Sequence, residues 1–209
     1  MYKSVLVGLT ALVGLSLASP TPVEVAPRCG TTYYPTILQQ LSENQPNTVQ
    51  KNTVGAGGEI KVQQSISGDG NPYLRTYQIV AFQNIPQGSY GCQLALSIPQ
   101  GYPVVFELNT SPSVQLNVTT VLKDNPSAIA YPNSWTWNNA AATLGFGGTG
   151  TFGTVSVAPG TSAVINSEAC ASNLAFLLEV SPWTGGRFAG VQFAQQNSPL
   201  AGFYLTTNC

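Results

Sequence analysis

Short runs of β-branched and aromatic residues, each bounded by glycine, proline or asparagine, constrain the fold of this chain more than any other feature. About ten such runs follow one another from residue 59 to the end of the chain. Several of them alternate apolar and polar side chains, as EIKVQQSIS does at residues 59–67. Many short strands at regular spacing are typical of antiparallel sandwiches and barrels. The pattern predicts an all-β fold, namely an antiparallel, jelly-roll-like β-sandwich.

Two segments depart from simple alternation. NLAFLLEV at residues 173–180 is the most continuous apolar run, which predicts a central strand buried on both faces. In YYPTILQQLSENQP, at residues 33–46, the apolar residues Ile37, Leu38 and Leu41 recur at helical spacing between two prolines. We therefore expect one short N-terminal helix there.

The first residues have the form of a secretory signal, because Lys3 precedes a short apolar run that ends near Ala18. We expect residues 1–18 to be a signal peptide and the proline-rich residues 19–28 to be a leader or pro-segment. Residues 29–209 then suit a single domain, with 29–57 as an N-terminal arm. The expected location is secreted, extracellular or cell wall, with no membrane contact in the mature form.

Four cysteines, Cys29, Cys92, Cys170 and Cys209, are an even number, which in a secreted chain predicts disulfide bonds. Four cysteines allow three connectivities. We prefer Cys29–Cys209, which would join the two ends of the mature chain, and Cys92–Cys170, which would join two strand ends. The other pairings stay open.

The charged residues exclude several classes of function. There are 7 basic and 8 acidic residues and no basic patch, so neither nucleic acid nor anionic lipid is an expected partner. The chain has no histidine, which excludes Ser-His-Asp catalysis and histidine-bound metals. Asp69 with Asn71 supplies too few oxygen ligands for calcium, and the glycine-rich residues 145–153 lack the strand–loop–helix context of a phosphate loop. We expect no metal and no cofactor.

A carboxylate pair is the one enzymatic option that remains, because glycoside hydrolysis needs two acids about 5–10 Å apart. Of the eight acidic residues, Glu24 lies in the leader and seven follow it: Glu43, Glu59, Asp69, Glu107, Asp124, Glu168 and Glu179. Glu179 ends the most apolar run, where burial would raise its pKa. We nevertheless expect these acids to lie at strand ends facing water, and we assign no catalytic residue.

The segment YPNSWTWNN, residues 131–139, has two interpretations. In an extended segment Tyr131, Trp135 and Trp137 would point the same way and could form a platform on which sugars stack. Alternatively, the tryptophans hold the long 123–149 loop against the sandwich, since tryptophan is highly buried on average. We favour the second interpretation, which predicts that Trp135 or Trp137 is mostly buried.

Two sequons predict N-glycosylation, at Asn109 and at Asn117. Pro112 follows the first sequon and disfavours it, so Asn117 is the preferred site. If residues 115–120 form a strand, alternation places Leu116 and Val118 in the core and Asn117 in solvent.

Seven motifs carry a resemblance to a known family, and they are, in chain order, CGTTYYPTILQQLSENQPNT, TYQIVAFQNIP, YGCQLALSIPQGYP, QLNVTTVLKDNP, YPNSWTWNN, FGTVSVAPGTSAVINSEAC and GFYLTTNC. Together they resemble fungal secreted proteins of the But-two C-terminal domain-like family. The resemblance covers nearly all of the chain after the leader and implies a fungal extracellular β-sandwich protein. That family is named for an intracellular member that binds a ubiquitin-pathway enzyme, a partner that a secreted protein would not meet. The resemblance implies no active-site residues.

Three classes of function follow from these observations. The first expectation is a secreted, non-catalytic glycoprotein of the cell wall or surface that binds polysaccharide. The alternatives are a carboxylate-dependent carbohydrate-active enzyme and a structural or effector protein without a ligand. Two acids facing each other in a groove would favour the enzyme, and acids scattered on the rim would favour the binder.

Overall fold

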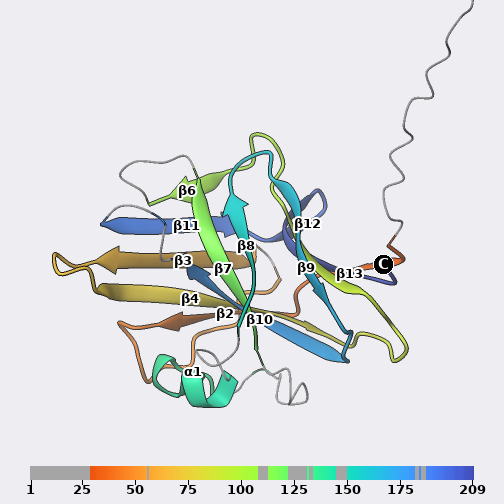
Figure 1. Cartoon of the computed structure of the whole chain (residues 1–209), viewed down its shortest axis with the longest axis horizontal. Coiled ribbons are helices and arrows are strands. Elements are labelled where there is room, and N and C mark those ends of the chain that lie inside the picture. Colours follow the sequence, from red (N-terminus) through yellow and green to blue (C-terminus); the bar gives the residue numbers. More distant parts are fainter. Residues whose placement is uncertain are drawn as a thin grey trace, which may run out of the picture.

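The computed structural model describes residues 29–55, 57–107, 113–121, 131, 134–144, 150–181, 184 and 187–209. These residues form two antiparallel β-sheets and one short helix, α1 (Trp137–Leu144) (Figure 1). The all-β fold and the antiparallel pairing agree with the prediction. Across the described residues, no helix has the length and apolar character that a membrane span requires.

The smaller sheet, called sheet A, has the strand order β1, β13, β5, β9. Its strands are β1 (Thr31–Tyr33), β13 (Leu200–Thr207), β5 (Cys92–Ser97) and β9 (Ser162–Glu168), and the short β12 (Gln196–Asn197) also pairs with β13. Figure 1 shows β9, β12 and β13 on the right of the molecule, on the same side as the C-terminus.

The larger sheet, called sheet B, has the order β6, β11, β3, β4, β10, β7, β8, and β2 also pairs with β4. Its strands are β2 (Ile37–Ser42), β3 (Glu59–Ile66), β4 (Pro72–Gln83), β6 (Val104–Phe106), β7 (Val114–Val121), β8 (Thr151–Val157), β10 (Asn173–Val180) and β11 (Phe188–Ala194). The strand β10 pairs with both β4 and β7, and its residues from Leu174 to Leu178 are buried. The prediction of a central strand buried on both faces is confirmed.

The core lies between the two sheets. Alternate side chains of both sheets meet there, including Leu94 and Phe203 from sheet A and Phe82, Leu116 and Phe176 from sheet B. The edge strands β8 and β9 lie very close to each other beside this core. A Cβ atom added to Gly153 would lie only 2.8 Å from Ile165 Cγ2. A glycine at this position therefore lets the edges of the two sheets approach each other.

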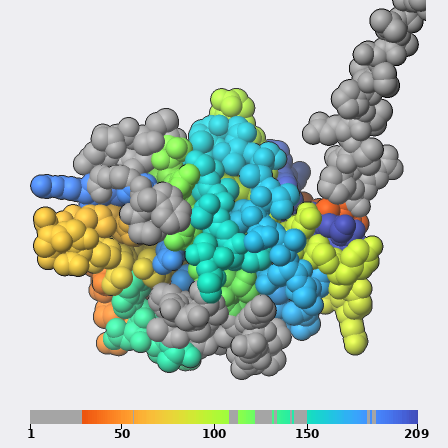
Figure 2. All heavy atoms as spheres, in the orientation of Figure 1, coloured from red at the N-terminus to blue at the C-terminus, as the bar shows by residue number. Residues whose placement is uncertain are grey.

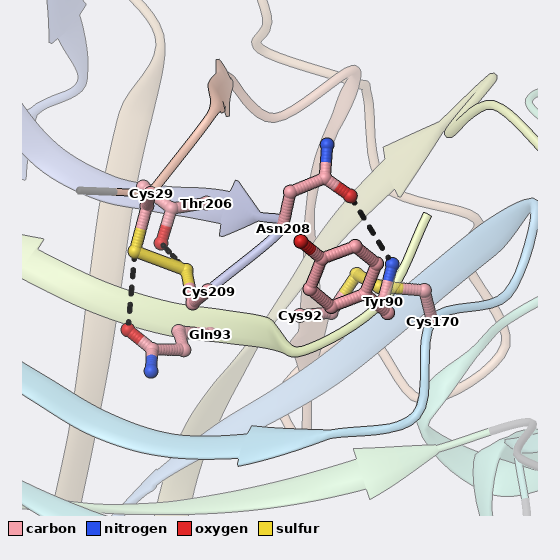
Figure 3. The surroundings of a disulfide bond; sticks show 8 residues. All are labelled: Cys29, Tyr90, Cys92, Gln93, Cys170, Thr206, Asn208 and Cys209. Atoms are coloured by element: carbon pink, nitrogen blue, oxygen red, sulfur yellow. Dashed lines mark hydrogen bonds between the residues drawn. A yellow bond between two sulfur atoms is a disulfide. The ribbon is translucent and has the colours of Figure 1, made fainter. Parts of the chain in front are cut away.

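Two disulfides close the fold at one end of sheet A (Figure 3). Cys29 pairs with Cys209 and Cys92 pairs with Cys170, which is the connectivity preferred from the sequence. The sequence separations are 180 and 78 residues, so the chain-entropy model gives each bond about 4–5 kcal/mol of stabilisation.

The predicted N-terminal helix is wrong, because residues Ile37–Ser42 form the strand β2. Ile37, Leu38 and Leu41 are all buried, and so is the polar Gln39, because both faces of this strand are covered. Apolar residues on a strand covered on both faces need not alternate, and here their spacing happened to match a helix. Residues 29–57, expected to be an arm, supply β1 to sheet A and β2 to sheet B.

Candidate functional site

The outer face of sheet B is covered by a second apolar cluster around Trp135. The outer cluster, as it is called below, consists of Ile37, Leu41, Tyr77, Ile79, Ala81, Val121, Trp135, Ala140, Ala175 and Leu177. The Trp135 side chain is 1% exposed, and its carbonyl oxygen accepts a hydrogen bond from Gln39 Nε2 at 3.3 Å. The prediction that at least one of the two tryptophans is mostly buried is confirmed.

A local cap starts the helix α1 directly after Trp135. Asn139 Oδ1 accepts a hydrogen bond from the Thr136 amide at 2.7 Å, and Thr136 Oγ1 accepts one from the Asn139 amide at 3.3 Å. These reciprocal bonds satisfy amides that a helix N-terminus leaves without intrahelical partners. The sequence analysis missed this helix, although the residues after Trp137 include three alanines that favour helix formation.

Trp137 lies at the margin of the outer cluster and is half-buried. Its ring packs against the Tyr77 ring with 4.9 Å between centroids, and the Arg75 guanidinium lies 4.7 Å from its centroid. Arg75 also forms an ion pair with Glu43 at 2.7 Å, and this hydrogen bond lowers the pKa of the Glu43 carboxyl. Trp137 therefore contacts both an aromatic ring and a cation.

The structure does not assemble Tyr131, Trp135 and Trp137 into a shared exposed platform. Trp135 is in the interior and Trp137 packs on Tyr77, while Tyr131 is 40% exposed. Of the three asparagines near these rings, Asn138 and Asn139 are engaged in contacts with Asn47 and the helix cap, and Asn133 lies outside the described residues. These aromatic rings hold the helix segment to sheet B.

Glu179 lies on the same face of sheet B, at the end of β10, and is half-buried. Burial raises the pKa of its carboxyl above the ordinary value, and hydrogen bonds from Tyr77 and Asn117 offset only part of that rise. Burial also raises the pKa of the Tyr77 phenol. The sequence-based expectation that burial could raise the Glu179 pKa thus holds.

Of the other acids expected at strand ends, three contact neutral side chains. Glu59 accepts a hydrogen bond from Gln40 at 3.3 Å, Asp69 is bonded to Ser67 and Asn71 in an exposed turn, and Glu168 accepts one from Thr120 at 3.3 Å. Asp124 lies outside the described residues. Among the described residues, no group of three or more His, Cys, Asp or Glu side chains could hold a metal ion.

Asn117 does not face solvent, so that part of the glycosylation prediction is wrong. It is 7% exposed, and its Oδ1 accepts a hydrogen bond from Ser181 Oγ at 3.0 Å while its amide also bonds Glu179. The outer face of sheet B is covered at this point, so alternation along β7 does not lead to water. Asn109 lies outside the described residues, and glycosylation stays a prediction at both sequons.

A pocket of ≈ 390 Å³ opens beside the point where the edges of the two sheets meet. This edge pocket is lined by Thr120, Gly150, Thr151, Phe152, Asn166, Ser167 and Glu168. The strands β8 and β9, which supply most of these residues, form a continuous surface in the centre of Figure 2. The lining combines one aromatic ring, several hydroxyl and amide groups, and one carboxylate.

The fold fixes the two most distinctive groups of the edge pocket. The Phe152 ring packs against Phe176 of the core with 5.2 Å between centroids, so one side of it is held in place. The Glu168 carboxylate is held by Thr120 from the neighbouring sheet. Sequence reasoning missed this pocket, because its residues come from separate strands and the motifs that contain them indicate no ligand chemistry.

Two other pockets lack this combination of groups. One of ≈ 240 Å³ is lined mainly by Pro35, Leu38, three glutamine or asparagine side chains and glycines, without an aromatic ring. Another of ≈ 360 Å³ lies between residues 86–89 and 170–172, beside the Cys92–Cys170 bond. The edge pocket is therefore the candidate site.

Comparison with known proteins assigns no family. No family model matches the chain, and a search of curated proteins finds no match either. The resemblance to the But-two C-terminal domain-like family therefore stays a prediction.

Proposed function

We propose that this chain is a secreted, non-catalytic glycoprotein of the cell wall or surface, and that it binds neutral polysaccharide in the edge pocket. The observation that carries the proposal is the lining of that pocket, where the Phe152 ring lies beside hydroxyl, amide and carboxylate groups. Ligand sites commonly join an apolar surface with a few well-placed polar groups. A sugar ring offers both counterparts, an apolar C–H face and a rim of hydroxyl groups.

The charge of the pocket favours a neutral ligand. Glu168 is the one charged residue among the lining residues. A carboxylate accepts hydrogen bonds from sugar hydroxyls, and such bonds to charged groups are the stronger ones, at about 1.5–3 kcal/mol. The same carboxylate would repel an acidic polysaccharide.

The proposal is tested by binding to laminarin, cellulose, chitin and xylan, with soluble oligosaccharides of any polymer that binds used for titration. Glu168→Gln keeps the size of the side chain and should weaken binding about tenfold, the equivalent of one charge-assisted hydrogen bond. Glu59→Gln is the matched control, since it makes the same change in β3, which three other strands of sheet B separate from β8. Unchanged affinity in Glu168→Gln, or a wild-type protein that binds none of the four polymers, would contradict the proposal.

Glu179 favours a second candidate, a carboxylate-dependent carbohydrate-active enzyme. Its half-buried carboxyl has a raised pKa, as a general acid requires. The described groups that act on it are Tyr77, Asn117 and Arg75, and none is the second acid that glycoside hydrolysis needs. Release of reducing sugar from the same four polymers, lost in Glu179→Gln, would establish the enzyme in place of the binder.

A third class, a structural or effector protein without a ligand, predicts no binding and no hydrolysis in these assays. Assignment of the fold to the jelly-roll type of sandwich, and of the chain to the fungal But-two C-terminal domain-like family, belongs to the same proposal. Both are compatible with the two antiparallel sheets and the two disulfides.

A further inference from the structure

Charge is distributed unequally between the two sheets. The strands of sheet A contain one charged residue, Glu168, which lines the edge pocket. The strands of sheet B contain four: Glu59, Lys61, Arg75 and Glu179. The outer surface of the sheet A strands therefore offers a partner neutral side chains only.

The strand register arranges these outward side chains in rows. Leu94, Leu96, Phe203 and Leu205 point into the core, so the residues that alternate with them point outward. The middle outward row runs across three strands and is apolar, consisting of Val164, Ala95 and Tyr204. A polar row flanks it on each side, one formed by Ser162 and Ser97, the other by Gln93, Thr206 and Thr32.

The apolar row is accessible at its two ends, Val164 and Tyr204. Val164 is 58% exposed, Tyr204 is half-buried, and Ala95 is buried where it pairs with both of them. Burial raises the pKa of the Tyr204 phenol, in agreement with its half-buried side chain. With strands about 4.8 Å apart, the row extends roughly 10 Å from β9 to β13.

This surface is continuous with the edge pocket through β9. Ser162 and Val164 belong to the outward rows, while Asn166 and Ser167 line the pocket, and all four are exposed. At the other end, the Cys29–Cys209 bond borders the polar row, with Cys209 Sγ 3.4 Å from Thr206 Oγ1 and Cys29 Sγ 3.7 Å from Gln93 Oε1 (Figure 3). Ser167 pairs with Gln93 and so extends that polar row into the pocket, and a ligand that leaves the pocket over Ser167 meets the apolar row after it.

We propose that the outer face of sheet A is an extended docking surface for a neutral polysaccharide, continuous with the edge pocket. The C–H faces of successive sugars would lie on Val164 and Tyr204, between which Ala95 is buried, and their hydroxyls would reach the polar rows on both sides. A neutral glycan chain has this same order across its width, an apolar face between hydroxyl-bearing edges. The inference rests on the proposed function, because it extends the ligand of the edge pocket beyond the pocket.

The test is a titration with oligosaccharides of increasing length, prepared from whichever of laminarin, cellulose, chitin or xylan binds the wild-type protein. Affinity should rise about tenfold from the shortest oligosaccharide that fills the pocket to the longer ones. Tyr204→Ala and Val164→Lys should each abolish this rise and retain wild-type affinity for the shortest ligand. Two variants are used because Val164 is exposed enough for a lysine to leave the fold intact, whereas Tyr204 is half-buried.

The remaining outcomes separate this inference from the proposed function. The docking surface is overturned if affinity does not depend on oligosaccharide length, or if the length dependence survives in both variants. In either case, binding that still depends on Glu168 would leave the edge pocket as the ligand site. A wild-type protein that binds none of the polymers overturns both. A dimer in sedimentation that Val164→Lys dissociates would assign the face to a second copy of the chain and also overturn the inference.

Discussion

The two sheets differ in what covers their outer faces. The outer face of sheet B is covered by the helix α1 and by Trp135, the largest fully buried side chain among the described residues. Among the described residues, no helix or tryptophan covers the outer face of sheet A, and Val164 in its middle row is 58% exposed. Charged groups whose pKa values are shifted, such as Arg75 and Glu179, belong to the covered face.

This difference separates the aromatic residues that stabilise the protein from those that are free to bind. A buried tryptophan contributes stability through the apolar surface that it removes from water. It contributes nothing to a ligand that stays outside. The outer face of sheet A and the edge pocket contain fewer rings, Tyr204 and Phe152, and the polar groups around them are uncharged except for Glu168.

The largest expected loss of stability is that of Trp135→Ala, on the covered face of sheet B. Truncating a fully buried tryptophan costs about 3–5 kcal/mol, so the free energy of unfolding in urea should fall by that amount. Polysaccharide binding at low temperature should persist, because Trp135 belongs to the covered face. Trp137→Ala is the matched control and should cost less, since Trp137 is half-buried. Equal losses in the two variants would contradict the anchoring role of Trp135.

On the side of sheet A, the next largest effect is expected from Gln195→Ala. Gln195 is buried, and its side-chain amide bonds both the N–H and the C=O of Phe203 at 2.8 Å. Leaving buried backbone groups unpaired should cost about 1–3 kcal/mol in the free energy of unfolding. The exposed Gln87→Ala serves as control. A melting temperature unchanged in Gln195→Ala would show that this amide does not support sheet A.

A smaller effect is expected at the helix cap of the covered face. Thr136→Ala removes the hydroxyl that accepts the Asn139 amide, which should cost about 1 kcal/mol. Thr136→Ser keeps the hydroxyl and should stay close to the wild type in thermal unfolding. If serine were as destabilising as alanine, packing of the methyl group would explain the loss better than capping.

The smallest expected effect is on the pH dependence of the free energy of unfolding. The folded-state pKa of Glu179 is raised from its ordinary value of 4.5, so its contribution to stability is present below that value and is lost as pH rises through the folded-state pKa. Glu179→Gln should remove this decline and leave stability at neutral pH equal or higher. Glu43, whose pKa is lowered, acts in the opposite sense, and its contribution is lost as pH falls. Unfolding free energies of the wild type and of Glu179→Gln across this range provide the test, and parallel curves would contradict it.

Much of the fold could be predicted because the signals for strands and turns lie in residues that are close in sequence. Alternation and turn residues located the strands from β3 onward, and the unbroken apolar run identified β10 as central. The positions of the cysteines at chain and strand ends favoured the two observed disulfides without excluding the other pairings.

The remaining features depended on contacts that are distant in sequence. The spacing of Ile37, Leu38 and Leu41 fits a helix and a doubly covered strand equally well, and pairing with β4 decided between them. Alternation placed Asn117 on the outer face of its sheet, but it could not show that this face is covered. Six of the seven residues that line the edge pocket lie between residues 150 and 168, but β8 and β9 belong to different sheets, and only the tertiary fold brings them together beside Thr120 of β7.

The most direct test of this account compares polysaccharide affinity in Trp137→Ala and Phe152→Ala, measured by titration with the same soluble oligosaccharide. Each variant removes one partly exposed ring, the first beside the covered face of sheet B and the second in the edge pocket. Thermal unfolding of both variants first establishes that each is folded at the temperature of the titration. The account predicts wild-type affinity in Trp137→Ala and loss of binding in Phe152→Ala. Loss of binding in Trp137→Ala with wild-type affinity in Phe152→Ala would contradict it, and would place the ligand on the face that the tryptophans cover.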